Sequence, residues 1–215
     1  MITHGKNIRI FAANASQKVA HGIAERMGLP LGDSVVKTFS DGEISVSINE
    51  TVRGNNISFE RVTASSPEFG WKCRNISMTD CNIDSVYYML ECEDSTLENV
   101  TLNGKYSFQY TKNLTVENSE LYTKDAFWHA NNVTVKNSIV SGEYLGWYSD
   151  GLTFINCKIS GTQPLCYCKN LRLINCTMDG ADLSFEYSDV TADINGKILS
   201  VKNPRSGGRD RRNHS

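Results

Sequence analysis

The sequence predicts a mainly β protein, a right-handed parallel β-helix of about seven to eight 19-residue coils, preceded by a small incomplete α/β segment. Three observations predict this fold. Apolar residues recur with a constant period, Asn and Asp recur at two fixed positions of the same repeat, and the period is absent before Gly54. Regular repeats of this kind are typical of solenoids, in which each unit stacks on the next.

The strand of each repeat is marked by alternating apolar and polar residues. The repeats start at Ile57, Ile76, Ser95, Leu114, Val133, Leu152, Leu171 and Val190, and mostly apolar residues follow two positions later, from Phe59 to Ala192. Such alternation is typical of half-buried strands. Because the spacing stays constant, we expect no insertion between these starts. We expect right-handed winding because parallel crossovers are generally right-handed.

Two polar columns mark the corners of the coils. The position before each start holds Asn56, Asn75, Asp94, Asn113, Asn132, Asn170 and Asp189, and the position four after it holds Asp80, Asn99, Asn118, Asn137, Asn156 and Asn175. Asn and Asp tolerate tight turns. Stacked about 4.8 Å apart, their side chains can bond from coil to coil. We therefore expect ladders of amides, with Asn118, Asn137 and Asn156 in single file.

Composition and charge exclude several classes of protein. The 215 residues carry a formal net charge of -2, and 40% are hydrophobic, which suits a folded chain with a continuous core. Neither a run of eighteen apolar residues nor the apolar core of a secretion signal within residues 1–9 is found. We expect no nucleic-acid partner, no membrane partner and a cytoplasmic location.

The seven cysteines occupy positions of small core residues. Cys81, Cys157 and Cys176 share one column of the repeat, and Cys73, Cys92 and Cys168 share another. There is no CxxC pair and the number is odd, so reduced, buried thiols are expected. We expect no metal site.

Residues 1–54 form a separate α/β segment in this interpretation. Residues 8–12, 35–39 and 44–48 have the pattern of strands, and residues 15–27 that of a helix whose apolar face holds Val19, Ala20, Ile23 and Met27. The stretches IRIFAANAS, GLPLG and TFSDGEISVSINETVRG resemble the N-terminus of ribose-phosphate pyrophosphokinase, also called PRPP synthetase. The resemblance covers about a quarter of the chain, and its FSDGE core is specific.

That resemblance implies an ATP site. It assigns Phe39, Asp41 and Glu43 to the adenine end of the site, where they reach across to a neighbouring subunit. An aromatic face can stack on a purine, and a carboxylate can accept a hydrogen bond from its amine. A turn made by Asp41 and Gly42 between two strands is the alternative for this stretch.

Activity alone is not expected, because the later DDxxDTGGT-type loop and the basic residues of that family are missing. Diphosphate transfer depends on positioning and charge neutralisation around metal-bound phosphates. We expect no cofactor; Mg and ATP would be cofactors only if the resemblance is functional.

The rest of the chain has a second resemblance. Segments such as SPEFGWKCRNI, GKYSFQY and TKDAFWHANNVTV resemble a bacterial family of right-handed, pectin-lyase-like β-helix proteins of unknown function. We divide the chain into a truncated PRPP-synthetase-like segment (1–54), a β-helix domain (55–203) and a disordered basic tail (204–215). The division indicates a fusion near Arg53 and Gly54, natural or an assembly artefact, with the α/β piece capping the N-terminal end of the helix.

The second half of each coil carries the candidate ligand face. We place on it Glu91, Tyr110, Asp125, His129, Tyr148 and Tyr167, with Glu186 ending the tyrosine column. Two interpretations stay open. The rings stack to stabilise the solenoid, or they bind a glycan whose apolar faces they cover while the acids bond its hydroxyls.

Together, these patterns predict a non-catalytic β-helix scaffold or binding protein of unknown ligand. The alternatives are a residual role as ribose-phosphate diphosphokinase and carbohydrate binding along the aromatic face. Candidate partners are a second copy of the chain, a full-length PRPP synthetase and a glycan.

Overall fold

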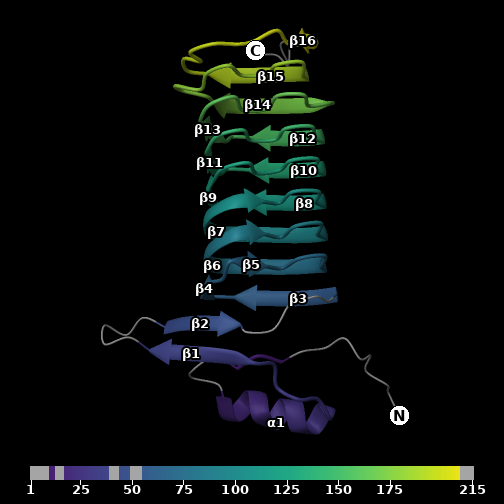
Figure 1. Cartoon of the computed structure of the whole chain (residues 1–215), viewed down its shortest axis with the longest axis vertical. Helices are drawn as coiled ribbons and strands as arrows, with labels where there is room; N and C mark the ends of the chain where they lie inside the picture. The colour runs from purple at the N-terminus through teal and green to yellow at the C-terminus, as the bar shows by residue number, and fades with distance from the viewer. Residues whose placement is uncertain (1–9, 13–16, 39–43, 49–54, 209–215) are drawn as a thin grey trace, which may run out of the picture.

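The chain winds as a β-solenoid of about eight turns, which confirms the predicted mainly β fold. Figure 1 shows the computed structural model, which describes residues 10–12, 17–38, 44–48 and 55–208. The coils stack along a single axis, with the N-terminal segment at one end and the C-terminus at the other. Its handedness stays a prediction.

One 16-stranded sheet runs through the stack. The coils are built from β3 (Asn55–Glu60), β4 (Thr63–Ser65), β5 (Glu68–Phe69), β6 (Arg74–Tyr88), β7 (Glu93–Ser107), β8 (Lys112–Glu117), β9 (Glu120–Thr123), β10 (Asn131–Lys136), β11 (Ile139–Ser141), β12 (Asp150–Ile155), β13 (Lys158–Ser160), β14 (Leu171–Thr177), β15 (Asp189–Asn195) and β16 (Ser206–Gly208). Their pairing is parallel, and the partners Ile57↔Ile76, Val133↔Leu152 and Leu171↔Val190 are starts of consecutive repeats. The predicted register of the repeat is confirmed at these strands.

The core is a file of apolar side chains inside the coils. The first strand of successive coils buries Met78, Leu97, Val116, Val135 and Phe154, each 1% exposed or less. A second file comes from the next strand segment and comprises Ile83, Leu102, Leu121, Val140 and Ile159, with similar burial. Because alternate residues of a strand point to opposite faces, the predicted alternation of apolar and polar residues produces this interior.

The corners use left-handed backbone at residues other than glycine. The φ angle is 53° at Asn156, 60° at Phe127 and 53° at His129. Asn tolerates this region, whereas a bulky residue is uncommon there. Each coil therefore turns at fixed positions, and the side chains at those positions lie over their equivalents in the coils above and below.

The Asn ladders form, with one difference from the prediction. Nδ2 of Asn156 donates to Oδ1 of Asn137 at 3.0 Å, and Nδ2 of Asn175 donates to Asn156 at 2.9 Å. The amide of Asn118 instead donates to Oε1 of Glu98 at 3.0 Å, and that of Asn137 to Glu117 at 3.5 Å. The expected single file from Asn118 is wrong at its first step, because neighbouring glutamates supply a charged acceptor.

The coil that begins at β14 has one extra residue before Leu183 and one residue fewer between Tyr187 and Val190, so the expected repeat holds at the strand starts and is interrupted between them. The counterparts of Leu165 and Tyr167 are Phe185 and Tyr187, one position later than the period requires, and all four have positive φ. The regular register returns at the next strand, where Leu171 pairs with Val190. Position 186, which the regular spacing assigns to the tyrosine column, therefore lies one step out of it.

The N-terminal segment adds a hairpin to the end of the stack. Strand β1 (Ser34–Thr38) pairs antiparallel with β2 (Ile44–Ile48), and β2 pairs with β4 through Val46↔Ala64. In Figure 1, the hairpin lies against the first coil, and the helix α1 (Gln17–Met27) lies beyond it. The predicted strands at 35–39 and 44–48 agree with β1 and β2 to within one residue. The capping role expected for this segment agrees with this pairing.

Helix α1 turns its apolar face differently from the prediction. It buries Ala20 and Ala24, whereas Val19 is 62% exposed, Ile23 46% and Met27 38%.

Among the described residues, no helix is long and apolar enough to cross a membrane. At the other end, the tail predicted to begin at residue 204 contributes β16, which pairs with β15.

Candidate functional site

Five rings form a continuous column on the outside of the solenoid. We call Tyr110, His129, Tyr148, Tyr167 and Tyr187 the ring column. The centroids of successive rings are 5.0, 5.1, 5.0 and 6.0 Å apart, and the ring planes differ by 8° to 13°. Four of the six residues predicted for the ligand face, Tyr110, His129, Tyr148 and Tyr167, are thereby brought together.

The backbone fixes the direction of these rings. The φ angle is 57° at Tyr110, 53° at His129 and 60° at Tyr148. The amide of Tyr110 donates to the carbonyl of Trp128 at 2.8 Å, and that of His129 donates to the carbonyl of Trp147 at 2.9 Å. Because the same turn and bond recur in each coil, every ring leaves the backbone at the same angle and stacks on the next.

A tryptophan layer supports the ring column. Trp128 and Trp147 stack at 5.5 Å with planes 4° apart, and Trp147 meets Tyr148 and Tyr167 edge to face. The indole Nε1 of Trp128 donates to the carbonyl of Tyr144 at 2.7 Å, and that of Trp147 donates to the carbonyl of Gln163 at 2.8 Å. These bonds to the next coil hold the indoles in place.

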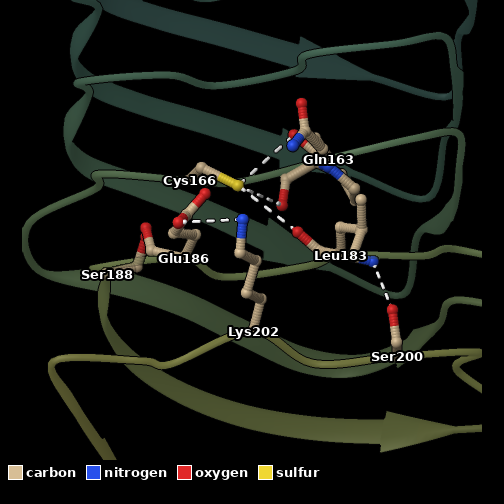
Figure 2. Close-up of polar contacts among 8 residues, drawn as sticks. Gln163, Cys166, Leu183, Glu186, Ser188, Ser200 and Lys202 are labelled. Atoms are coloured by element: carbon tan, nitrogen blue, oxygen red, sulfur yellow. Dashed lines mark hydrogen bonds and ion pairs between the residues drawn. The ribbon is translucent and has the colours of Figure 1, made fainter.

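Figure 2 shows the polar contacts around Cys166 and Glu186, where successive coils meet near the C-terminal end of the solenoid. Cys166 stands where the preceding coils have Trp147 and Trp128, and its Sγ lies 3.5 Å from the carbonyl oxygen of Leu183. Burial raises the pKa of Cys166 to about 11. Nζ of Lys202 pairs with Oε1 of Glu186 at 3.1 Å. Glu186 was predicted to lie in the tyrosine column, but it forms this ion pair instead. Tyr187 occupies the column position.

The stacking decides which ring surfaces are open. Two near-parallel rings with centroids 5.0 Å apart, such as Tyr148 and Tyr167, are in direct contact, so no third ring fits between them. The inner members of the column therefore present only their edges to solvent, although Tyr148 is 47% exposed. Only the end members, Tyr110 and Tyr187, have a ring face that no other member of the column covers.

A hollow of about 320 Å³ lies at the Tyr110 end of the column. It is lined by Glu91, Glu93, Tyr110 and Lys112. Nζ of Lys112 is 3.3 Å from Oε1 of Glu93, which also pairs with Arg74, and Nζ of Lys72 is 3.5 Å from Oε2 of Glu91. The hollow thus combines an aromatic ring with negatively charged hydrogen-bond acceptors and a positively charged donor.

Asp125, the remaining residue predicted for the ligand face, is buried. It is only 8% exposed, and burial raises the pKa of its carboxyl above the ordinary value. The neighbouring Lys124 pairs with Glu143 at 2.9 Å. Asp125 is therefore part of the packed corner and does not belong to an exposed binding surface.

The cysteines are all buried free thiols, as predicted. Burial raises the pKa of Cys168 to about 12. Sγ of Cys157 donates to the carbonyl of Val135 at 3.4 Å, and Sγ of Cys176 donates to the carbonyl of Phe154 at 3.5 Å. Within the ranges that the structure describes, no group of three His, Cys, Asp or Glu side chains could hold a metal ion.

The residues predicted for an ATP site, Phe39, Asp41 and Glu43, lie outside the described residues.

Comparison with known proteins identifies the family. A family model described as "Protein of unknown function (DUF3737)" matches residues 37–211. The chain belongs to this family. The DUF3737 match includes all of the coils and begins within β1, so it also includes most of the hairpin that lies against the first coil.

A second group of matches concerns about a quarter of the chain. Ribose-phosphate pyrophosphokinase of Clostridium perfringens is 49% identical over 65 residues, which cover 30% of this chain and 20% of that protein. The enzyme of Clostridium acetobutylicum is 53% identical over 57 residues, covering 26% and 18%. The chain thus spans about a fifth of the length of these curated relatives. The predicted resemblance to this family is confirmed for that part of the sequence.

The sequence interpretation missed three residues of this site. Tyr187 closes the ring column, and Glu93 and Lys112 line the hollow. A signal for Tyr187 was present, because it is an aromatic residue one position beyond the regular spacing from Tyr167, where the regular position holds a glutamate. Glu93 is half-buried and Lys112 is exposed, and both occupy strand starts, where charged residues carry no distinguishing pattern.

Proposed function

We propose that this DUF3737 chain is a non-catalytic β-solenoid that acts as a scaffold or binding protein. The observation that carries the proposal is the ring column, in which the richest exposed side chains are used to stack on one another. Around it, Glu91, Glu93 and Glu186 are held in ion pairs with cations. A cytoplasmic location belongs to the same proposal.

An activity assay tests the non-catalytic part. Purified full-length chain is incubated with ATP, Mg²⁺ and ribose 5-phosphate, and AMP release is measured. We expect no turnover above a heat-inactivated sample, because the chain corresponds to about a fifth of the relatives that carry the synthetase name. Turnover above that control would overturn the proposal.

A second candidate function is association with a full-length ribose-phosphate pyrophosphokinase. Identities of 49% over 65 residues and 53% over 57 residues favour it. In this role the chain would contribute Phe39, Asp41 and Glu43 to a neighbouring ATP site. Co-purification with an intact synthetase tests the association, and an Asp41→Ala variant that leaves the ATP affinity of that partner unchanged would argue against the site.

A third candidate is glycan binding along the ring column. Tyr110 is 49% exposed, Tyr148 47% and Tyr187 60%, so hydroxyl-bearing ring edges line the surface. Because the inner ring faces are covered, a glycan would bind through these hydroxyls and through the two end rings. A glycan array probed with the full-length chain tests this role, and an array without signal would remove it.

A further inference from the structure

The ring column ends at Tyr110, because the equivalent positions in the two preceding coils hold Glu91 and Lys72. Glu91 precedes Tyr110 by one period of the repeat and has the same backbone, with a φ angle of 54° against 57°. Its amide donates to the carbonyl of Gln109 at 2.9 Å, as the amide of Tyr110 does to Trp128 at 2.8 Å. Glu91 therefore stands where the next ring of the column would be, and together with Tyr110 it lines the hollow of about 320 Å³.

The height of this space suits a flat ring. Successive rings of the column are 5.0 or 5.1 Å apart between Tyr110 and Tyr167, close to the rise of about 4.8 Å between parallel strands. The carboxylate of Glu91 is turned toward Lys72, one coil further from Tyr110, with 3.5 Å between Oε2 and Nζ. A planar aromatic ring on Tyr110 would continue the column at its own spacing, whereas a puckered sugar ring is thicker.

The polar groups around the hollow indicate what the ring should carry. The two carboxylates, Glu91 and Glu93, accept hydrogen bonds, so they favour a ring with an amino group at its edge. Three cations, Lys72, Arg74 and Lys112, pair with these two carboxylates. These ion pairs contain three cations and two carboxylates, and the additional cation favours a ligand that also bears an anionic group.

We propose that this hollow binds a mononucleotide with an amino-bearing base. The base stacks on the open face of Tyr110 and takes the place of the next ring in the column. A carboxylate of Glu91 or Glu93 accepts from the exocyclic amine, and the phosphate is oriented toward the lysines at the rim. The proposal rests on the binding role proposed above and gives that role a ligand class.

Binding to the full-length chain is measured by titration calorimetry with AMP, inosine monophosphate and inorganic phosphate. AMP is expected to bind. Inosine monophosphate, which lacks the amine, is expected to bind about tenfold more weakly, because a hydrogen bond to a charged group is lost. Phosphate alone should show no saturable binding. Equal affinities for AMP and phosphate would overturn the proposal, because the lysines alone would then account for binding.

Variants at the two ends of the column locate the site. Tyr110→Ala should weaken AMP binding about tenfold or more through the loss of base stacking. The matched control Tyr187→Ala removes the ring at the opposite end and should leave the affinity unchanged. Glu91→Tyr fills the hollow with a side chain that suits this backbone, so it should abolish AMP binding and raise the Tm. AMP binding that survives Glu91→Tyr unchanged would overturn the proposal.

Two further measurements distinguish binding at this hollow from the other candidate functions. If Asp41→Ala abolishes AMP binding, the nucleotide binds the N-terminal segment and the hollow is not its site. If glucose competes with AMP at the hollow or binds in its place, the ligand class is wrong while the binding role stands. Consumption of bound AMP would contradict the non-catalytic proposal and leave the site itself in place.

Discussion

The inside and the outside of one corner carry the same arrangement of rings in opposite surroundings. Phe108 and Phe127 stack inside at 5.0 Å and 11°, and Tyr110 and His129 stack outside at 5.0 Å and 8°. All four have φ angles between 53° and 60°. The inner pair is fully buried, whereas Tyr110 is 49% exposed. Geometry is thus matched and burial differs, so the comparison separates the energy of burial from that of stacking.

The largest effect is expected inside. Phe127→Ala should lower the free energy of unfolding by about 3 to 5 kcal/mol, because it leaves a cavity among Phe108, Phe154 and their neighbours. Urea unfolding followed by circular dichroism measures the change. A loss below about 1 kcal/mol would show that the inner stack contributes little more than the outer one.

The next effect concerns the amide ladder at a different corner of the coil, which follows the first strand. Asn156→Ala removes a donor to Asn137 and an acceptor for Asn175, and it places alanine at a φ angle of 53°. We expect a loss of about 2 kcal/mol from the two bonds and the backbone cost together. Asn156→Gly is the matched control, because glycine accepts this backbone. If both variants lose the same stability, backbone strain plays no part.

The outer stack is expected to contribute less. His129→Ala removes a ring that stacks on Tyr110 and on Tyr148, and the loss should be about 1 kcal/mol because the site is exposed. His129→Phe keeps the stacking and should restore the stability in the same urea experiment. A loss as large as that of Phe127→Ala would remove the distinction between the two sides.

The smallest effect is a pH dependence at Asp125. Burial raises the pKa of this carboxyl in the folded state, so the protonated form favours folding, and its contribution is lost as the pH rises through the folded pKa. Asp125→Asn should therefore raise the Tm slightly at pH 7 and have less effect in acid. A variant that lowers the Tm at pH 7 and not in acid would contradict this sign.

The sequence predicts the stack well because a solenoid repeats its own contacts. The regular spacing of Ile57, Ile76 and Leu114 is a consequence of strands that pair directly above one another, so the period reveals the pairing. Single departures are harder to predict. The extra residue before Leu183 shifts one corner and is offset before Val190, so the spacing from Leu171 to Val190 keeps the regular period.

The candidate site was predicted in part. The ring column follows from tyrosines that recur with the period of the repeat, but the sequence does not show that their faces cover one another. Asp125 was placed on the ligand face because it lies in the second half of its coil, whereas the folded corner leaves it only 8% exposed. The hollow lies beside Glu91, which has no ring to stack on Tyr110. The sequence shows a glutamate at this position, but only the structure shows that the other members of the column stack on one another.

The left-handed corners also have a consequence for how this protein can change its length. Each coil completes one turn within one period and pairs with the coils directly above and below it. A whole coil can therefore be duplicated or deleted without altering the direction in which the next coil starts. The distance between the hairpin at one terminus and the tail at the other is then adjustable in steps of one strand spacing. A solenoid built this way can vary in reach while it keeps both terminal structures unchanged.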